Sequence, residues 1–327
     1  MRIGMDTSPL VQTRAGTARY IRGLLGELER RSDLDVRRLS FGSAGKAAAI
    51  VRDSAWYLAI LPWQARTLDV LHCTTFRAPL RSPIPVVVTV HDLAVLRHPE
   101  LFTPWVRLYG FVALRRVVRA ATRVIAVSEF TKSEIVELIG LAEERVHVVP
   151  NAAEPAFRPD GPAAEGDYVL AVGTLEPRKN LVRLAEATRR LGVELRVVGA
   201  RGWGDVDVSQ NGVRWLGELP DAEVAALYRG ALCLAYPSLY EGFGLPVLEA
   251  MRCGAPVVTS AGTVMEELAG DAAELVDPLD PASIAAGIER AIGRRSELGA
   301  RGLERAERYT WAAAADATIS VYRHAAG

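Results

Sequence analysis

Short runs of β-branched and apolar residues alternate with longer amphipathic stretches along almost the whole chain. The short runs do not alternate between polar and apolar residues, so they predict strands of a parallel sheet that is covered on both faces. The longer stretches, such as 18–31, 104–120 and 130–140, have apolar residues at helical spacing. Together these features predict an α/β fold of the Rossmann type.

A proline-rich segment divides this alternation into two halves. Residues 150–166, PNAAEPAFRPDGPAAEG, carry four prolines and no apolar periodicity, which is typical of an interdomain linker. We therefore expect two facing Rossmann-like domains with parallel sheets, 1–153 and 154–310, and a final helix in 311–327 that could pack back on the first domain. The expected strands lie at 2–5, 36–41, 69–72, 85–91, 123–127 and 145–149, and then at 167–172, 194–198, 213–216, 231–236, 255–259 and 273–276.

The composition is that of a globular protein, with 327 residues, 50% hydrophobic and 24% charged. The longest apolar runs have the length of a strand, well short of the roughly 18 residues that span a bilayer. Met1 leads directly into a strand, without the charged start and apolar stretch of a signal peptide. Cys73, Cys233 and Cys253 have apolar neighbours and no CxxC spacing, which predicts buried free thiols in a reducing compartment. We therefore expect a cytoplasmic protein.

Charge is distributed unequally although the formal net charge is zero. Residues 1–150 sum to +7 and residues 151–327 to −7. Such an asymmetry indicates an anionic partner for the basic half. Only three of the 39 basic residues are lysines, namely Lys46, Lys132 and Lys179, and the last of these lies in a candidate site.

Ligands of open parallel sheets bind at the carboxyl ends of the strands, so function is expected in the loops that follow them. In AVGTLEPRKNLVRLAEA, a strand ends at Gly173 and a loop then carries Arg178 and Lys179. Asn180 can cap the helix that follows. Two adjacent cations at a helix N-terminus suit a diphosphate, because the amides and the helix dipole add to their charge. The alternative is a solvated basic turn before a surface helix.

A second informative loop lies in YPSLYEGFGLPVLEAMRCGAPVVTS. Gly242 and Gly244 let the backbone approach a ligand closely, and a helix then begins near Pro246. Glu241 and Glu249 are eight residues apart, and each carboxylate can accept hydrogen bonds from a ribose or sugar diol. The alternative is that Glu241 caps the helix while Glu249 is a surface residue. The apolar neighbours of Glu249 argue against solvent exposure.

These two segments resemble the donor-site signatures of retaining glycosyltransferases of family 4, including an E-x7-E pattern. That resemblance implies the GT-B fold and a sugar transfer from a nucleotide-diphosphate donor. Weaker matches extend it over nearly the whole chain: GTARYIRGLL, VTVHDL, VIAVSEFTKSEI and VVPNA in the first half, and VGARGW and LGELPDAEVAALYRGA in the second.

The resemblance also implies roles for individual residues. Arg178 and Lys179 would hold the donor pyrophosphate and stabilise its growing charge, so that they are catalytic as well as binding groups. Glu241 would contact hydroxyls of the transferred sugar, and Glu249 would bind the nucleotide ribose. The other expected donor-binding residues are Gly16, Gly173, Arg201, Leu219, Gly242, Phe243, Gly244 and Leu245.

His91 follows a buried strand of the first domain. The resemblance implies that it lies beside the sugar, where its imidazole or backbone carbonyl stabilises positive charge at the anomeric carbon. Without the resemblance, a single histidine in this place is more often a core residue. The leaving phosphate itself would take the proton of the acceptor, so the resemblance requires no separate base. Gly16 is the only glycine in QTRAGTARY, where family members often have a pair.

No metal or cofactor is expected. The segment DVD at 205–207 matches the Asp-x-Asp metal pattern of a different glycosyltransferase fold, but it lies in a polar loop and the Arg178–Lys179 pair already supplies positive charge. Two other functions stay open, namely a sugar-nucleotide epimerase of the same fold and a non-catalytic nucleotide-sugar-binding subunit. The pyridoxal-phosphate lysine that a glucan phosphorylase needs is not evident among the three lysines. GDP-mannose is the first candidate for the donor, and the acceptor is a glycan, a lipid-linked sugar or a small molecule. No nucleic acid is expected as a partner.

One helix of the basic half suggests a membrane surface. The segment 103–123 has Trp105, Leu108, Tyr109 and Val112 at helical spacing, with five arginines close by. An apolar stripe with aromatic residues and arginines can lie at an anionic membrane surface, where lipid-linked acceptors reside. This predicts peripheral contact with the inner face of the membrane. The alternative is an ordinary helix packed on the sheet, with solvated arginines.

Overall fold

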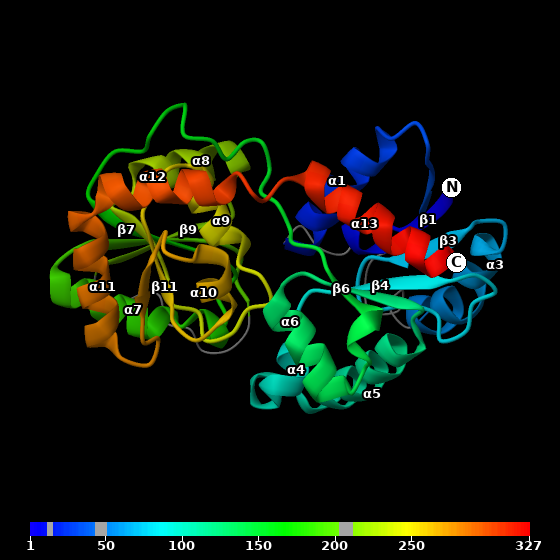
Figure 1. Ribbon diagram of the computed structural model, residues 1–327. Helices are drawn as coiled ribbons and strands as arrows, with labels where there is room; N and C mark the ends of the chain where they lie inside the picture. The colour runs from blue at the N-terminus through cyan, green and yellow to red at the C-terminus, as the bar shows by residue number, and fades with distance from the viewer. Residues whose placement is uncertain (12–15, 43–50, 203–211) are drawn as a thin grey trace. The chain divides into compact units, whose positions relative to one another are not determined.

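The computed structural model describes residues 1–11, 16–42, 51–202 and 212–327, apart from the side chains of residues 52–54, 105 and 109. The chain forms two compact units (Figure 1). Unit 1 comprises Met1–Ala152 and Thr310–Gly327, and unit 2 comprises Ala153–Tyr309. Each unit is built on its own parallel sheet of six strands, which confirms the predicted α/β class.

The sheet of unit 1 has the strand order β2-β1-β3-β4-β5-β6. Its pleat sends Val86, Val88 and Val90 into one apolar core and Val87 into the other, so the sheet is buried on both faces. The strands are β1 (Arg2–Asp6), β2 (Asp35–Leu39), β3 (Val70–Cys73), β4 (Val86–Val90), β5 (Arg123–Ala126) and β6 (Val146–Val148).

Helices α1 (Gly16–Glu29) and α13 (Trp311–Ala326) share one of these cores. Helix α5 (Pro104–Ala120) contributes to the other core through its C-terminal half. The shorter helical elements of unit 1 are η1 (Ser8–Val11), η2 (Arg52–Ile60), α3 (Leu61–Ala65), α4 (Ala94–Arg97), η3 (Pro99–Leu101), α6 (Glu129–Glu134), η4 (Ile135–Ile139) and η5 (Glu143–Arg145).

Helix α13 belongs to unit 1 although it follows unit 2 in the sequence. Its first residue, Trp311, packs where α1 has Gly23, and a Cβ at Gly23 would lie only 2.0 Å from the indole. A side chain at this position would therefore force the two helices apart. Further along α13, Ile319 and Tyr322 are buried in the same core.

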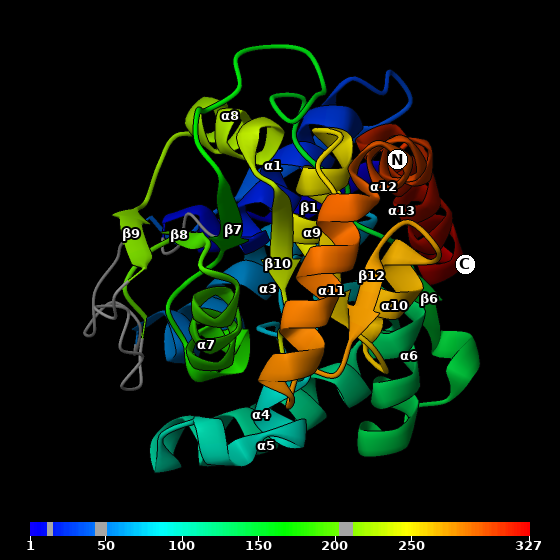
Figure 2. The ribbon, with the colours of Figure 1, turned by 90° about the vertical axis from the view of Figure 1, so that its left-hand side faces the viewer.

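The sheet of unit 2 has the order β12-β11-β10-β7-β8-β9. Helices α7 and α11 share the core on one face, and Figure 2 shows them on the near side of the strands. The strands are β7 (Tyr168–Val172), β8 (Glu194–Val198), β9 (Val213–Gly217), β10 (Cys233–Tyr236), β11 (Val257–Ser260) and β12 (Glu274–Val276). The helices are η6 (Pro177–Lys179), α7 (Leu181–Leu191), α8 (Asp221–Gly230), α9 (Leu245–Arg252), α10 (Val264–Ala269), α11 (Pro281–Gly293) and α12 (Arg295–Ala306).

The strands expected from the sequence are all present, with ends that differ by at most two residues. The expected helix 104–120 is confirmed as α5, whereas the segment 130–140 consists of two pieces, α6 and the wider turn η4. The second piece ends at Gly140, whose φ of 71° reverses the chain. Within the described ranges, no helix is both long and apolar enough to cross a bilayer.

Candidate active site

The strand order of unit 2 reverses between β7 and β10. From β7 the chain continues outward to β8 and β9, and it then returns to β10 on the other side of β7. At such a point in an open parallel sheet, the loops at the carboxyl ends diverge and leave room for a ligand. The loop after β7 carries Arg178 and Lys179, and the loop after β10 carries Glu241, so the fold brings both predicted loops to this edge.

Glycines allow the loops after β7 and β8 to touch. A Cβ on Gly199 would lie 2.0 Å from the carbonyl oxygen of Gly173, and one on Gly202 would lie 2.4 Å from that of Leu175. Gly173 has a φ of 150° and also leaves space for Lys179, whose Cε would lie 3.1 Å from an added Cβ. The predicted site residue Gly173 therefore shapes the loop and makes room for the lysine.

The Arg178 guanidinium lies between two carboxylates. Its Nη1 donates to Oε2 of Glu241 over 2.7 Å, and its Nη2 is 2.7 Å from Oε1 of Glu176. Nη1 also donates to the carbonyl oxygen of Tyr240 at 3.3 Å. These contacts hold the planar guanidinium in one orientation, which excludes the interpretation of Arg178 as part of a solvated basic turn.

Lys179 and Glu241 form a part-buried ion pair in which Nζ lies 2.5 Å from Oε1. The same Oε1 accepts hydrogen bonds from the Tyr236 hydroxyl at 2.9 Å and from the Ser238 hydroxyl at 2.7 Å. Lys179 donates to the Tyr236 hydroxyl as well. Glu241 is thus surrounded by four donors, two of them cationic, and is only 8% exposed.

Charge decides the ionisation of this cluster. Burial by itself would raise the pKa of Glu241, but Lys179 and Arg178 outweigh burial and lower the pKa to about 2. The pKa of Lys179 is lowered because burial outweighs the attraction of Glu241. The two directions differ because the carboxylate is held by two cations, whereas Lys179 shares its carboxylate with Arg178. Glu241 is therefore a carboxylate at neutral pH.

Glu176 is a functional candidate that the sequence analysis missed. It is 2% exposed and pairs with Arg178, and burial raises its pKa despite that pairing. The signal in the sequence is an acidic residue two positions before the arginine in LEPRK. The two cations by themselves account for a diphosphate-binding loop, so the sequence pattern assigns no separate role to this carboxylate.

Asn180 lies at the N-cap position of α7, but its side chain does not cap the helix. Its Nδ2 donates to the carbonyl oxygens of Pro237 at 3.0 Å and Pro278 at 2.6 Å instead. Its φ of 59° makes it the one non-glycine residue with positive φ in the described ranges. The predicted capping bond is therefore wrong, because the amide ties together three loops at the carboxyl edge.

Glu249 lies inside α9 and is 1% exposed. Its Oε2 accepts a hydrogen bond from the Tyr228 hydroxyl of α8 at 3.1 Å. The argument that Glu249 is not a surface residue is confirmed. Helix α9 has Gly244 as its N-cap, without a capping side chain, so the alternative in which Glu241 caps the helix is wrong.

The residues between the two glutamates are packed tightly. Gly244 has a φ of 101°, and a Cβ there would lie 2.6 Å from the sulfur of Met265. Phe243 is buried edge-on against Tyr309, with ring centroids 6.0 Å apart, so its side chain contributes to packing. Gly242 is buried, and Leu245, the first residue of α9, is half-buried.

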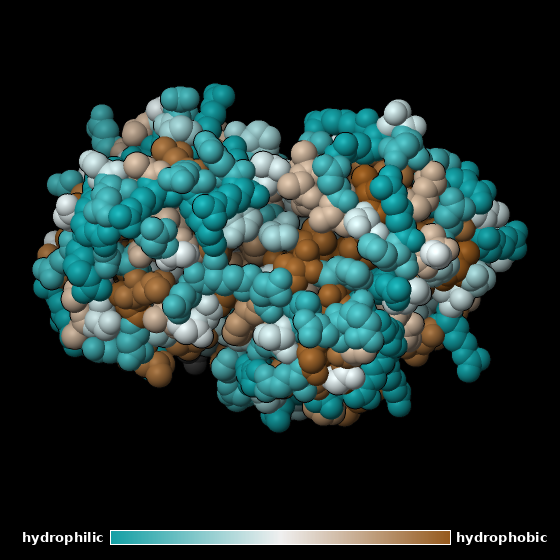
Figure 3. Space-filling view, in the orientation of Figure 1, coloured by the Kyte–Doolittle hydropathy of each residue, from teal (hydrophilic) through white to brown (hydrophobic). Residues whose placement is uncertain are grey.

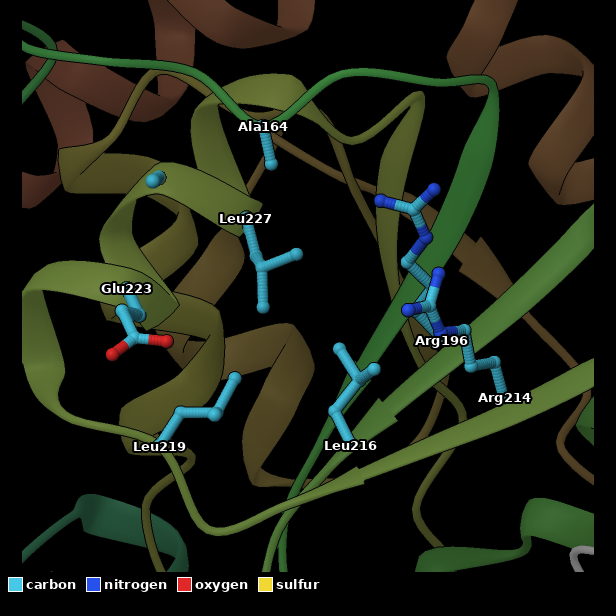
Figure 4. A pocket seen from close by; sticks show the side chains of 8 residues that line it. Ala164, Arg196, Arg214, Leu216, Leu219, Glu223 and Leu227 are labelled. Carbon is cyan, nitrogen blue, oxygen red and sulfur yellow. The ribbon is translucent and has the colours of Figure 1, made fainter.

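Two further predicted donor-binding residues are Arg201, which precedes β9 in the sequence, and Leu219, which follows it. Arg201 is exposed, with its guanidinium 4.9 Å from the centre of the Trp215 ring. Leu219 faces Leu216 across a cavity of about 370 Å³ between α8 and the strands β8 and β9 (Figure 4). Neither Arg178, Lys179 nor Glu241 lines this cavity, so the described contacts do not join Leu219 to the charged cluster.

Unit 1 contains His91, directly after β4. Its Nε2 donates to the carbonyl oxygen of Thr74 at 2.9 Å, and its ring lies edge-on to Tyr20 with centroids 4.9 Å apart. Burial lowers the pKa of His91, although the bond to Thr74 acts in the opposite sense. The imidazole is therefore held neutral and in a fixed orientation.

Two other features of unit 1 concern its carboxyl edge. Gly16, the predicted phosphate-facing glycine, is exposed and begins α1, while residues 12–15 before it lie outside the described ranges.

Asp6, at the end of β1, is fully buried and accepts hydrogen bonds from the Ser8 amide at 3.0 Å and the Tyr57 hydroxyl at 2.9 Å. Gly16 and His91 belong to unit 1, whereas the charged cluster belongs to unit 2.

The three cysteines are buried and free, as predicted. Burial raises the pKa of Cys233 and of Cys253 to about 12, so both are inert thiols. Within the described ranges, no group of three or more His, Cys, Asp or Glu side chains is placed to hold a metal ion. The DVD segment at 205–207 lies outside those ranges.

Solved structures share this architecture along the whole chain. Sucrose-phosphate synthase from Thermosynechococcus elongatus aligns with a TM-score of 0.83 at 18% identity, covering 99% of this chain and 98% of that chain. WaaG, a glycosyltransferase involved in lipopolysaccharide biosynthesis, aligns with a TM-score of 0.71 at 16% identity and covers 99% and 98%. The fold is that of the GT-B glycosyltransferases.

Sequence relatives narrow the class to a family. The family described as Glycosyl transferases group 1 matches residues 153–309, and Glycosyltransferase Family 4 matches residues 15–157. O-antigen chain mannosyltransferase B of Escherichia coli is 34% identical over 284 residues, which cover 78% of this chain and 74% of that protein. An MMP alpha-(1->4)-mannosyltransferase of Mycolicibacterium hassiacum is 30% identical over 278 residues, covering 74% and 66%. The chain belongs to glycosyltransferase family 4 and is a glycosyltransferase.

Proposed function

We propose that this glycosyltransferase transfers a hexose from a nucleotide-diphosphate donor held in unit 2, retains the anomeric configuration and needs no metal. The observation that carries the proposal is the partly buried cation pair Arg178 and Lys179 at the point where the strand order reverses. GDP-mannose is the first candidate for the donor, since mannosyltransferases are among the relatives. An epimerase and a non-catalytic binding subunit are not favoured by these relatives.

The two cations act on the leaving group. When the bond between the anomeric carbon and the phosphate oxygen breaks, negative charge grows on the diphosphate, and Arg178 and Lys179 stabilise it. The acceptor oxygen forms the new bond on the same face of the sugar, and its proton passes to the leaving phosphate. Among the described contacts, Lys179 uses two of its three N–H groups on Glu241 and Tyr236, which leaves one for a phosphate oxygen.

The carboxylates orient the two cations and bind hydroxyls of the donor. Glu176 orients Arg178, and Glu241 orients Lys179 while offering its Oε2 side to hydroxyls of the transferred sugar. Glu249 binds the nucleotide ribose. Its carboxylate is 1% exposed and its Oε2 accepts a hydrogen bond from Tyr228, so the ribose must displace neighbours of Glu249 to reach it. Loss of nucleoside-diphosphate affinity in Glu249→Ala, but not in Tyr228→Phe, is the expected result in calorimetry. Unchanged affinity in Glu249→Ala would refute the ribose role.

The remaining predicted residues complete the donor site. Amides of Gly242 to Leu245 surround the sugar and phosphates, and Arg201 and Leu219 contact the base. In unit 1, His91 stabilises positive charge at the anomeric carbon and Gly16 approaches the diphosphate. A neutral imidazole suits this role, because an imidazolium would repel the developing charge.

A donor panel tests the proposal. Thermal shifts with GDP-, UDP-, dTDP- and ADP-sugars identify the donor, because a ligand that binds the folded state stabilises it by mass action. With that donor, NMR of the product is expected to show the anomeric configuration of the donor, and EDTA should leave the rate unchanged. An inverted product would overturn the retaining mechanism, and loss of activity in EDTA would revive a metal site. Slow release of nucleoside diphosphate without acceptor separates an enzyme from a binding subunit.

A further part of the proposal is peripheral contact of unit 1 with an anionic membrane, where a lipid-linked acceptor would lie. Helix α5 exposes apolar side chains in its N-terminal half, among them Leu108 at 62%, and buries Leu114 and Val118 in its C-terminal half. Figure 3 shows hydrophobic surface among hydrophilic surface around α4 and α5. Arg107, Arg115 and Arg116 supply the positive charge.

Vesicle sedimentation tests this contact. Binding is expected to rise with the fraction of anionic lipid and to fall with salt, because ions screen the arginines. Leu108→Ser should weaken it, whereas Leu279→Ser, which changes a leucine of unit 2 that is 61% exposed, should not. Absence of binding at low salt would leave α5 as an ordinary surface helix.

A further inference from the structure

A chain of buried polar side chains crosses the core of unit 1. The Tyr322 hydroxyl on α13 lies 2.7 Å from Nδ1 of His72 on β3, and Nε2 of His72 lies 2.8 Å from the Thr89 hydroxyl on β4. The Thr89 hydroxyl in turn lies 2.8 Å from the hydroxyl of Tyr20 on α1. All four side chains are at most 1% exposed.

The chemistry of these groups allows a connected network. A neutral imidazole has one donor and one acceptor, so His72 can join two hydroxyls, and each hydroxyl can both donate and accept. Burial lowers the pKa of His72 to about 3, so it is neutral over the range in which enzymes work. Fully connected polar networks in a core favour one arrangement of the elements that they join. Apolar side chains would fill this part of the core equally well, so the polar side chains point to a role beyond packing.

The last member of this hydrogen-bonded series, Tyr20, contacts the predicted catalytic residue His91. Thr89 and His91 are two residues apart, so they face the same side of the sheet. The ring of Tyr20, fixed by Thr89 at its hydroxyl, meets His91 edge-on at 81° with centroids 4.9 Å apart. Its other neighbour is Trp311 at 6.3 Å, the first residue of α13. Helix α13 therefore reaches Tyr20 twice, directly through Trp311 and through the network that begins at Tyr322.

We propose that Tyr322, His72, Thr89 and Tyr20 are positioning residues for His91, and that the C-terminal helix α13 thereby fixes the imidazole used in the reaction. The inference rests on the role proposed above for His91. The bond to Thr74 fixes one edge of the imidazole ring, and the T-shaped contact with the Tyr20 ring limits its tilt from another side. Small displacements of a reacting group are costly to the rate, which gives a buried network of this kind a function beyond stability.

The test removes hydroxyls and keeps shape. Tyr322→Phe and Thr89→Val are each expected to lower kcat about tenfold through misplacement of His91. The donor KM should stay within about twofold, because Arg178 and Lys179 in unit 2 bind the donor by charge. Thr89→Ser keeps the hydroxyl, so its kcat should stay near that of the wild type. The matched control is Tyr168→Phe in unit 2, which removes a buried hydroxyl that donates to the carbonyl oxygen of Leu227 at 2.7 Å. This control should lower the melting temperature but not kcat.

A double-mutant cycle separates positioning from stability. In the His91→Ala background, Tyr322→Phe should cause no further loss of kcat, because its effect passes through the imidazole. The NMR signal of the His91 ring should shift in Tyr322→Phe and Thr89→Val but not in Tyr168→Phe, a measurement that does not depend on activity. Wild-type kcat in both network variants, or an equal loss with and without His91, would overturn the positioning role. Full activity of His91→Ala alone would instead overturn the role of His91 in the proposed function.

Discussion

Both units bury a carboxylate at the carboxyl edge of a parallel sheet, but they treat its charge in opposite ways. In unit 1, Asp6 is held by the amide and hydroxyl of Ser8 and by the Tyr57 hydroxyl, and burial raises its pKa. In unit 2, Glu241 is held by Lys179 and Arg178 in addition to hydroxyls, and its pKa falls to about 2 against the effect of burial. Neutral donors satisfy a buried carboxylate, whereas cations also keep it ionised.

The other side chains of the two sites also differ in charge. The network of His72, Tyr20 and Tyr322 on one side of His91 is neutral at working pH, because these side chains are fully buried. The groups around the reversal point of unit 2 are two cations and two carboxylates. The charged site suits a diphosphate, and the neutral one suits the orientation of a single imidazole. Substitutions in the two units should therefore differ in size and in kind.

The largest effect is expected for Lys179→Ala. Loss of a charged contact to the leaving diphosphate should lower kcat by about 10²–10³, a cost of roughly 3–4 kcal/mol in the transition state. Steady-state kinetics with the identified donor measures it. The matched control is Lys132→Ala, which removes an ion pair with the exposed Glu143 of unit 1 and should leave kcat unchanged. Wild-type turnover of Lys179→Ala would contradict the assignment of the cation pair.

Acidification should destabilise unit 2 through Glu241. A folded-state pKa of about 2, below the ordinary 4.5, means that the folded state binds fewer protons than the unfolded chain. The carboxylate therefore stabilises the fold above the unfolded pKa, and this contribution, at most about 3 kcal/mol, is lost as the pH falls towards 2. Hydrogen exchange of β10 and α7 amides measures it locally. Glu241→Gln should flatten the dependence on pH, and an unchanged slope would contradict the ion pair.

A moderate effect is expected for Glu176→Gln. The amide keeps the volume but loses the charge that holds Arg178, so kcat should fall about tenfold through misplacement of the guanidinium. Affinity for nucleoside diphosphate should stay the same or rise, since one negative charge leaves the site. Calorimetry and kinetics together reveal this split. Glu186→Gln, which removes an exposed pair with Arg190, serves as control. A parallel loss of affinity and kcat would indicate a structural role only.

The smallest effect is expected for Asp6→Asn. The raised folded-state pKa means that the charged form is disfavoured in the fold, so a neutral amide of the same shape should change the unfolding free energy by less than about 1 kcal/mol. The sign of the pH dependence is opposite to that of Glu241, because protonation of Asp6 favours the folded state as the pH falls through its folded-state pKa. Hydrogen exchange of β1 and β3 amides provides the measurement. A large loss of stability at neutral pH would show that ionised Asp6 is needed in unit 1.

The charged site was the more predictable of the two. Arg178, Lys179 and Glu241 follow different strands, but the carboxyl ends of parallel strands share one edge, so their proximity could be expected from the sequence. Glu176 and the side-chain bonds of Asn180 could not, because each depends on which loop crosses the edge nearby. The proposed ribose residue Glu249 was expected to be sheltered, and the structure adds that it is bonded to Tyr228 of a different helix.

The alternation of strands and helices, the ends of the strands to within two residues, and the two loops that carry the cations and Glu241 could all be predicted from the sequence. These are local features, fixed by apolar periodicity and by the residues that stop strands and begin helices. The packing of α13 on α1, the bonds of His72 to Tyr322 and Thr89, and the position of Arg178 between two carboxylates depend on how the elements pack in three dimensions. Tyr322 and His72 are 250 positions apart in the sequence, and no local pattern encodes a contact over such a distance. It arises when helices and strands pack to bury their apolar faces, and the polar groups carried into the core must then find partners there.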